Sequence, residues 1–342
     1  MFLSLRVPRI TVVALSLLVV PAIAAQRKPA AVHNLGLENV NTAEWRRGTI
    51  SPSLLLKLQV LLDRAHASPG EIDANRGENT RKAVAAFREM RNLGSGEQVD
   101  ERLWRALADK DNEPALVIYT ITEKDVAGPF IDEIPKDYRE KATLKRLSYT
   151  SAQELLAEKF HMSEKLLRQL NPDAPFDRAG TQIVVTNVQR EALPRKISRV
   201  EVDGSRQRVL AYDKDDAVVA IYPATVGSSE RPSPSGEFKV TSVAENPTYH
   251  YDPALNLRGV DVQEPLNLPP GPNNPVGLVW IALSAKGYGI HGTPDPDTVS
   301  KRTSHGCVRL TNWDALELAR HVSKGTPVTI SQQSPGRQAR RY

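Results

Sequence analysis

The second half of the chain has the texture of a β-protein, and this feature constrains its fold more than any other. From residue 196 onward, short segments alternate apolar and polar side chains and are separated by turn residues, starting with Val200 and Val202 ahead of an Asp203-Gly204 turn. Short strands that recur about every ten residues are typical of a sandwich or a barrel. Residues 196–331 are therefore predicted to form a C-terminal, mainly-β domain with a sandwich-like or barrel-like core.

One long segment of this domain lacks any periodicity. Residues 245–277 hold seven prolines. A long irregular segment inside a compact domain is usually either a functional lid or disordered, and the sequence leaves both open. After it, the pattern predicts a strand over 278–283, a helix that opens at Asn312 and a final strand over 327–330.

The N-terminal half contains a pattern for a small helical module. Residues 51–110 repeat leucine at helical spacing, break at Ser68-Pro69-Gly70, and place Asp100 where it can cap a further helix. This pattern predicts three helices. The leucines of the first helix are Leu54, Leu55, Leu58, Leu61 and Leu62.

A second module is predicted over residues 149–188, in the order β-α-α-β. Ser151 and Glu154 have the spacing of a capping box for its first helix, and Ser163 begins the second. Residues 111–148 contain three prolines and are interpreted as a linker with some strand character. The whole chain is thus predicted to be a multidomain α+β protein, and 342 residues suit two or three modest domains.

The N-terminus has the layout of a secretion signal over residues 1–24. Two arginines precede an apolar run over residues 10–20, and Ala22-Ile23-Ala24 follows as a small-residue cleavage site. The alternative is an uncleaved membrane anchor, but the run is short against the roughly twenty apolar residues that a spanning helix needs. We therefore expect an exported protein that starts with a flexible segment over residues 25–50 and has no integral membrane span.

The formal charge of +5 lies at the two ends of the chain. Residues 1–24 hold two arginines and no acidic residue, and the last six residues hold three arginines and no acidic residue, so the rest of the chain is neutral. A nucleic-acid-binding protein needs a basic patch on its folded body, which this composition does not indicate. Residues 332–342 are predicted to be a basic disordered tail.

The chain has a single cysteine, Cys307, within Ser304-His305-Gly306-Cys307-Val308-Arg309, and His291-Gly292-Thr293 precedes it. A lone cysteine is either an inert, buried side chain or a nucleophile with a nearby base. The thiol, with an ordinary pKa of about 8.5, needs a base at neutral pH. His305 shares a face with the thiol in an extended chain, whereas His291 comes from another strand end and can be placed freely. We therefore predict that His291 is the base and that Gly292, beside it, leaves a nearby backbone carbonyl accessible to orient its ring.

The neighbouring residues are predicted to shape the site. Gly306 allows close backbone approach, so the N–H groups of Gly306 and Cys307 could form an oxyanion hole, with Ser304, His305 and Gly292 around it. Arg309 offers a fork for a substrate carboxylate, or else forms a surface salt bridge.

A zinc site is the chemical alternative for this cluster. His291, His305 and Cys307 could supply three ligands. The sequence lacks an accompanying His-Glu-x-x-His pattern, so no metal and no cofactor are predicted.

The two histidine segments resemble the signature of the L,D-transpeptidase catalytic domain, in the group common in Gram-negative envelopes. The resemblance covers about residues 197–331 and includes Thr225-Val226-Gly227, Pro234-Ser235-Gly236-Glu237-Phe238 and residues 269–277. It implies that Cys307 attacks the peptide bond before the terminal D-alanine of a tetrapeptide stem and passes the acyl group to an amine. It further implies that His291 is the general base and that Arg309 contacts the donor carboxylate. The gap of twelve residues between His291 and Ser304 is short for the family, which implies a trimmed loop.

The N-terminal modules resemble wall-binding modules. Residues 51–110 are similar to a three-helix peptidoglycan-binding module, although Ala74 and Arg88 depart from its pattern, and residues 149–188 are similar to a degenerate lysin motif. The resemblance implies stem peptides and glycan strands as partners, possible transfer to an envelope lipoprotein, and a periplasmic or envelope location. An L,D-carboxypeptidase that uses water, and a non-catalytic wall-binding protein, stay open as alternatives.

Overall fold

The computed structural model describes residues 35–48, 50–109, 111–190, 192–193, 196–227, 233–253, 262–301 and 306–331. The predicted signal peptide, the predicted basic tail, and the predicted site residues Ser304 and His305 lie outside these ranges. Within them, no helix is long and apolar enough to cross a membrane.

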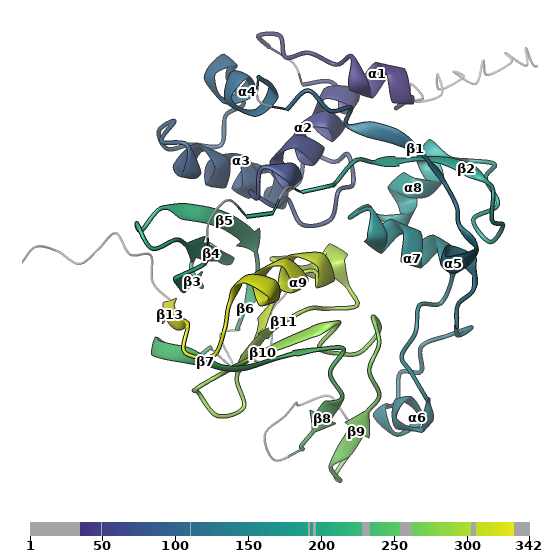
Figure 1. Ribbon diagram of the computed structural model, residues 1–342, viewed down its shortest axis with the longest axis vertical. Coiled ribbons are helices and arrows are strands. Elements are labelled where there is room, and N and C mark those ends of the chain that lie inside the picture. Colours follow the sequence, from purple (N-terminus) through teal and green to yellow (C-terminus); the bar gives the residue numbers. More distant parts are fainter. Residues whose placement is uncertain are drawn as a thin grey trace, which may run out of the picture. The chain divides into compact units, whose positions relative to one another are not determined.

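Three helices form the first module: α2 (Pro52–Arg64), α3 (Glu78–Met90) and α4 (Glu101–Ala108) (Figure 1). Asp100 caps α4 as predicted, because its side chain accepts a hydrogen bond from the Leu103 N–H at 2.8 Å. The leucine stripe of α2 packs against Phe87 and Leu103 in one buried cluster. Periodicity and capping alone account for this module.

A further helix, α1 (Leu37–Asn41), lies in the stretch predicted to be flexible. Val40 is fully buried, and the Asn41 side chain hydrogen-bonds both the N–H and the carbonyl of Leu116, at 2.8 and 2.9 Å. These long-range contacts order a segment that is too short to be helical on its own.

The β-α-α-β module begins earlier than predicted. Its first strand is β1 (Leu116–Thr120), which pairs antiparallel with β2 (Gln182–Thr186), and α7 (Ala152–Lys159) and α8 (Glu164–Leu170) lie between them in sequence. The stretch interpreted as a linker therefore holds this strand and two short helices, α5 (Glu123–Val126) and α6 (Tyr138–Thr143). The β-branched and aromatic residues of β1 form a strand because β2 pairs with them more than sixty residues later.

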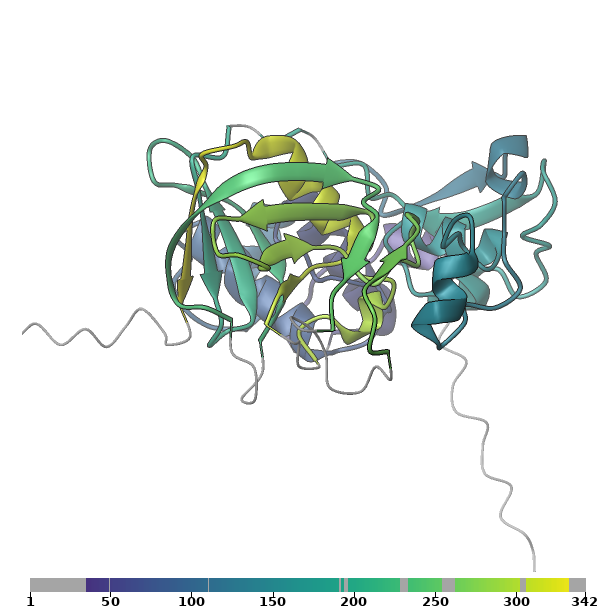
Figure 2. The same ribbon diagram turned by 90° about the horizontal axis from the view of Figure 1, so that it is seen from below.

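The C-terminal domain is built on one nine-stranded sheet in the order β5-β4-β3-β13-β7-β10-β11-β12-β6. Its two end strands, β5 and β6, are separated by Ala224 alone, so the sheet curls back on itself into a barrel-like form (Figure 2). The helix α9 (Asn312–His321) contributes Leu318 to the core of this domain. The strands are β3 (Arg199–Asp203), β4 (Arg208–Tyr212), β5 (Val218–Pro223), β6 (Thr225–Val226), β7 (Gly236–Glu245), β10 (Val279–Leu283), β11 (Gly289–His291), β12 (Val308–Arg309) and β13 (Pro327–Ser331).

The proline-rich segment carries a small hairpin of its own. Strands β8 (Tyr249–Tyr251) and β9 (Leu266–Leu268) pair antiparallel and form a separate two-stranded sheet. Tyr251 and Leu268 are buried in an apolar cluster distinct from the main core. The described part of this segment is therefore ordered, although it lacks the periodicity of a larger sheet.

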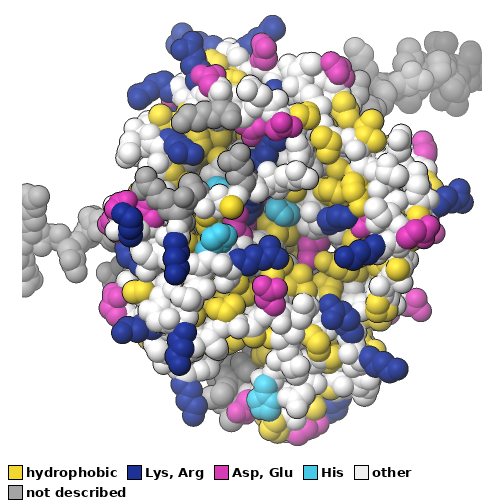
Figure 3. All heavy atoms as spheres, in the orientation of Figure 1, with side chains coloured by type: hydrophobic (Ala, Val, Ile, Leu, Met, Phe, Trp, Pro, Cys, Tyr) yellow, Lys and Arg dark blue, Asp and Glu magenta, His cyan; other side chains and the backbone are white. Residues whose placement is uncertain are grey.

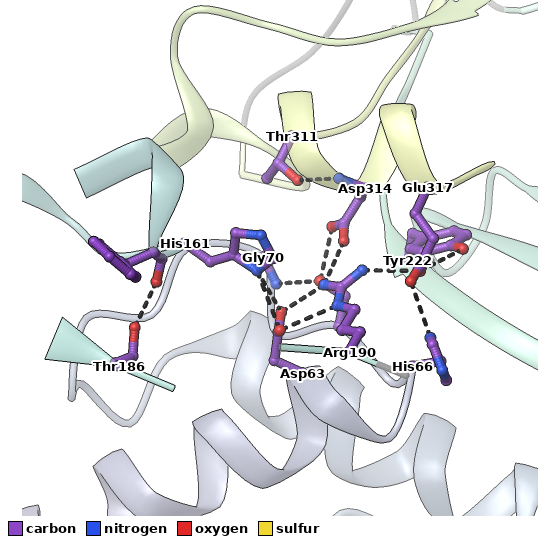
Figure 4. A network of polar contacts seen from close by, with 12 residues as sticks. Asp63, His66, Gly70, His161, Thr186, Arg190, Tyr222, Thr311, Asp314 and Glu317 are labelled. Atoms are coloured by element: carbon purple, nitrogen blue, oxygen red, sulfur yellow. Dashed lines mark hydrogen bonds and ion pairs between the residues drawn. The ribbon is translucent and has the colours of Figure 1, made fainter. Parts of the chain in front are cut away.

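A buried ion network joins the modules (Figure 4). Arg190, which follows β2, contacts Asp63 on α2 at 2.5 Å, and Asp314 and Glu317 on α9 at 2.8 and 2.9 Å. His161 bonds Asp63 at 3.1 Å. Burial favours the neutral acids, but the Arg190 charge outweighs it and lowers the pKa of Asp63, and it lowers the pKa of Glu317 to about 2.

Replacing Arg190 by methionine is expected to lower the free energy of unfolding by about 3–5 kcal/mol near neutral pH, because buried carboxylates lose their counter-charge. The depressed pKa of Glu317 stabilises the folded protein above the ordinary carboxyl pKa of about 4, and this contribution is lost as the pH falls toward 2. The difference in the free energy of unfolding between the wild type and Arg190→Met should therefore narrow as the pH falls through this range. Urea unfolding of both proteins at several pH values measures this difference. Arg105→Met, which removes an exposed ion pair with Glu101, is the control and should cost less than about 1 kcal/mol.

Candidate active site

Three neighbouring strands place one row of side chains on the same face of the sheet. Trp280 of β10 pairs with His291 of β11 in the antiparallel register, and His291 pairs with Arg309 of β12 in the parallel register. Ile290 and Val308, one position along, lie in the buried core. Because strand side chains alternate, the core takes one face and the Trp280–His291–Arg309 row lies on the other.

Cys307 extends this row by one step. It precedes Val308, which pairs with Ile290, so Cys307 lies opposite Gly289 and on the same face as His291. Strand spacing and rise place the Cα atoms of such diagonal neighbours about 8 Å apart, which their side chains can bridge. The thiol is partly exposed and donates to the Gly287 carbonyl at 3.9 Å, and the Gly289 N–H bonds the thiolate form.

The His291 ring is buried and held on two sides. Its Nδ1 lies 2.6 Å from the Gly292 carbonyl, and a carbonyl partner requires that Nδ1 carries the proton. Nε2 is then left with a lone pair. The Trp280 ring stacks on the imidazole with centroids 5.5 Å apart and an interplanar angle of 21°.

Burial decides the charge state of the predicted pair. It lowers the pKa of His291 to about 3, helped by the positive charge of Arg309 and opposed by the bond to Gly292. Burial also raises the pKa of the Cys307 thiol. The hydrogen bond from the Gly289 N–H and the positive charge of Arg309 lower this pKa, but the effect of burial is larger. At neutral pH the two groups therefore rest as thiol and neutral imidazole, and the imidazole is able to accept the thiol proton.

Glycines allow close packing around these residues. Gly306 has φ +114°, which few other residues adopt, and a Cβ there would lie 2.9 Å from the Tyr288 ring. Its carbonyl accepts a hydrogen bond from the buried Ser233 hydroxyl at 2.7 Å. A Cβ on Gly277 would lie 2.6 Å from the Gly292 backbone, so the end of the proline-rich segment rests on the residue that orients His291.

The comparisons with known proteins agree on one family. The model of the YkuD L,D-transpeptidase catalytic domain matches residues 197–330. YkuD of Bacillus licheniformis is 32% identical over 181 residues, which cover 52% of this chain and 92% of that protein. The chain belongs to the L,D-transpeptidase family.

Other L,D-transpeptidase relatives match a similar part of the chain. YqjB of Bacillus subtilis is 35% identical over 134 residues, 38% of this chain and 69% of that protein. The solved catalytic domain of the Enterococcus faecium L,D-transpeptidase is 26% identical, and the match covers 40% of this chain and 99% of that domain with a TM-score of 0.31.

Most site residues predicted for this L,D-transpeptidase domain lie together at β11 and β12. They are His291, Gly292, Gly306, Cys307 and Arg309. Within the described ranges the side chain of Arg309 has no hydrogen bond or ion pair. In the same ranges no three His, Cys, Asp or Glu side chains form a group that could hold a metal ion.

Sequence analysis missed Trp280 as a site residue. Its indole lies above Gly289, where a Cβ would come within 2.7 Å of Trp280 Cζ2. The available signal was the glycine in Gly289-Ile290-His291, one strand after the tryptophan. Only the strand register shows that the two rings are cross-strand neighbours.

The raised thiol pKa makes a prediction about reactivity. Iodoacetamide reacts with the thiolate, so alkylation of Cys307 should be slow at neutral pH and still be rising above about pH 9. Intact-mass kinetics across pH measure the profile, and the urea-unfolded protein should show a lower midpoint because its thiol regains the ordinary pKa. A rate that reaches its plateau below pH 7 would instead mean a resting thiolate–imidazolium pair.

Proposed function

We propose that this protein is an exported peptidoglycan L,D-transpeptidase whose nucleophile is Cys307 and whose base is His291. The observation that carries the proposal is the strand register that puts the Cys307 thiol, the neutral His291 imidazole and the Arg309 guanidinium on one face of the sheet. Family membership supports the reaction class. The donor is a tetrapeptide stem and the acceptor is an amine, from a second stem or from a lysine of an envelope lipoprotein.

The first half-reaction acylates the thiol. His291 Nε2 takes the Cys307 proton as sulfur attacks the carbonyl before the terminal D-alanine, and the negative charge on the carbonyl oxygen is met by the N–H groups of Gly306 and Cys307. The imidazolium returns the proton to the leaving nitrogen, so D-alanine departs and a thioester remains on Cys307. The Gly292 carbonyl stabilises the transient imidazolium because it accepts from Nδ1.

The second half-reaction reverses these roles. An amine attacks the thioester carbonyl and loses a proton to His291, the carbon–sulfur bond breaks, and the thiol is restored as a new amide forms. The neutral state of His291 suits both halves, because each begins with a proton transfer to the ring.

Arg309 is proposed to bind a carboxylate of the donor stem. The guanidinium lies beside His291 and has no carboxylate partner within the described residues. A charge-assisted hydrogen bond from the Arg309 guanidinium to this carboxylate holds the scissile peptide bond near the Cys307 sulfur.

The N-terminal modules are proposed to bind glycan strands in the periplasm or envelope. Lysine and arginine side chains are interspersed with acidic ones on the face in Figure 3, rather than gathered in a basic patch. Such a surface suits an uncharged polymer better than a nucleic acid. Retention of a Cys307→Ala variant on isolated cell walls tests this binding apart from turnover.

Incubation with a tetrapeptide stem, followed by intact mass, tests the catalytic proposal. The expected adduct has the mass of the stem without D-alanine and maps to Cys307, and Cys307→Ala should form none. His291→Ala should acylate about 10²–10⁴-fold more slowly, because the base is lost. His321→Ala, on the far end of α9, should acylate normally.

The outcome also separates the rival functions. No adduct on the wild type would leave a non-catalytic wall-binding protein. An adduct that turns over to the free tripeptide even with amine present would indicate an L,D-carboxypeptidase.

A further inference from the structure

The β-α-α-β module carries an insertion that packs on the hairpin of the catalytic domain. We define the insertion as residues 127–148, between α5 and α7. The Tyr138 ring of α6 meets the Tyr251 ring of β8 edge to face, with centroids 5.3 Å apart. Figure 1 shows α6 beside β9. Both sides share one apolar cluster, made of Ile134, Tyr138, Leu144, Leu147, Tyr249, Tyr251, Val262, Leu266 and Leu268.

Backbone hydrogen bonds lock the end of the insertion to the segment after the hairpin. The Leu147 N–H donates to the Pro270 carbonyl, and the Asn273 N–H donates to the Leu147 carbonyl, both at 3.0 Å. The Asn273 side chain donates to the Ser148 carbonyl at 2.9 Å. Gly271 passes so close that a Cβ there would lie 2.1 Å from the Leu147 oxygen. Leu147 is fully buried, so its hydrogen bonds to Pro270 and Asn273 are shielded from water.

The segment that contains Pro270 and Asn273 leads directly to the candidate active site. It continues to Gly277, which packs closely against the Gly292 backbone beside His291. The hairpin also lies near the thiol, because Tyr249 is close enough to Cys307 for their charges to interact. Burial raises the pKa of Tyr249, and the negative charges of Tyr138 and Cys307 add to the rise. Burial raises the pKa of Tyr138, and the Arg309 charge opposes it.

We propose that the insertion is a positioning element that holds strands β8 and β9 near the thiol and so favours an amine over water as the acceptor of the acyl group. This rests on the proposed function. The acyl-enzyme has two outcomes. Amine attack forms a carbon–nitrogen bond, and water attack forms a carbon–oxygen bond and a carboxylic acid. In both, the carbon–sulfur bond breaks and the thiol regains a proton. A cover that is held in place excludes water from the thioester, while a loose one admits it.

The test compares two substitutions of one residue in the full-length protein. Tyr138→Ala removes the ring that packs on Tyr251, whereas Tyr138→Phe keeps the ring and removes only the hydroxyl. The measurement is the ratio of hydrolysed to transferred product from a tetrapeptide donor with a fixed amount of amine acceptor. Tyr138→Ala should raise this ratio by roughly 2- to 30-fold, the range typical of substitutions along a coupled network, and Tyr138→Phe should match the wild type.

Two further variants keep the test decisive. Leu266→Ala loosens the same contact from the hairpin side, should raise the ratio similarly, and replaces Tyr138→Ala if that variant does not fold. Arg139→Ala, next to Tyr138 on α6, removes exposed ion pairs to Asp137 and Glu264 but leaves the apolar cluster in place, and should leave the ratio unchanged.

The possible failures are distinguishable. No stem adduct on the wild type overturns the proposed function itself. Normal acylation with an unchanged ratio in both folded packing variants overturns the positioning role. A Tyr138→Phe ratio equal to that of Tyr138→Ala also overturns it, because the hydroxyl rather than the packing would then act.

Discussion

A single buried guanidinium holds the parts of this chain together. Arg190 comes from the end of the β-α-α-β module and is neutralised by carboxylates of α2 and α9. An ion of this kind is stable inside a protein only where its partners are fixed at hydrogen-bonding distance. The three-helix module, the β-α-α-β module and the catalytic domain therefore meet at one buried network.

The same physical effect has opposite results at the ion network and at the candidate active site. Burial works against every charge, but at Arg190 the opposite charges are close enough to keep Glu317 ionised. At His291 the nearest charge is the cation Arg309, so burial and charge act together and the ring stays neutral. Glu317 is thus held charged in the network, whereas His291 is held neutral.

Local signals predicted much of the structure, and long-range contacts account for the rest. The leucine stripe and the Asp100 cap concern neighbours within one helix, so the three-helix module followed from the sequence. The cysteine and histidine segments pointed to the L,D-transpeptidase family because their chemistry is specific, and the family model matches residues 197–330. The stretch that holds β1 was interpreted as a linker with some strand character because the partner of β1 is distant, and the positions of Trp280 and of the insertion depend on register and packing that no local pattern records.

The resting charge state of Cys307 has a consequence for the lifetime of the protein. It is the one cysteine of the chain, so a sulfenic acid formed there has no second thiol in the same molecule with which to form a disulfide. Attack by peroxide requires the thiolate, and burial keeps that form scarce. The protonated thiol is, for the same reason, expected to oxidise slowly.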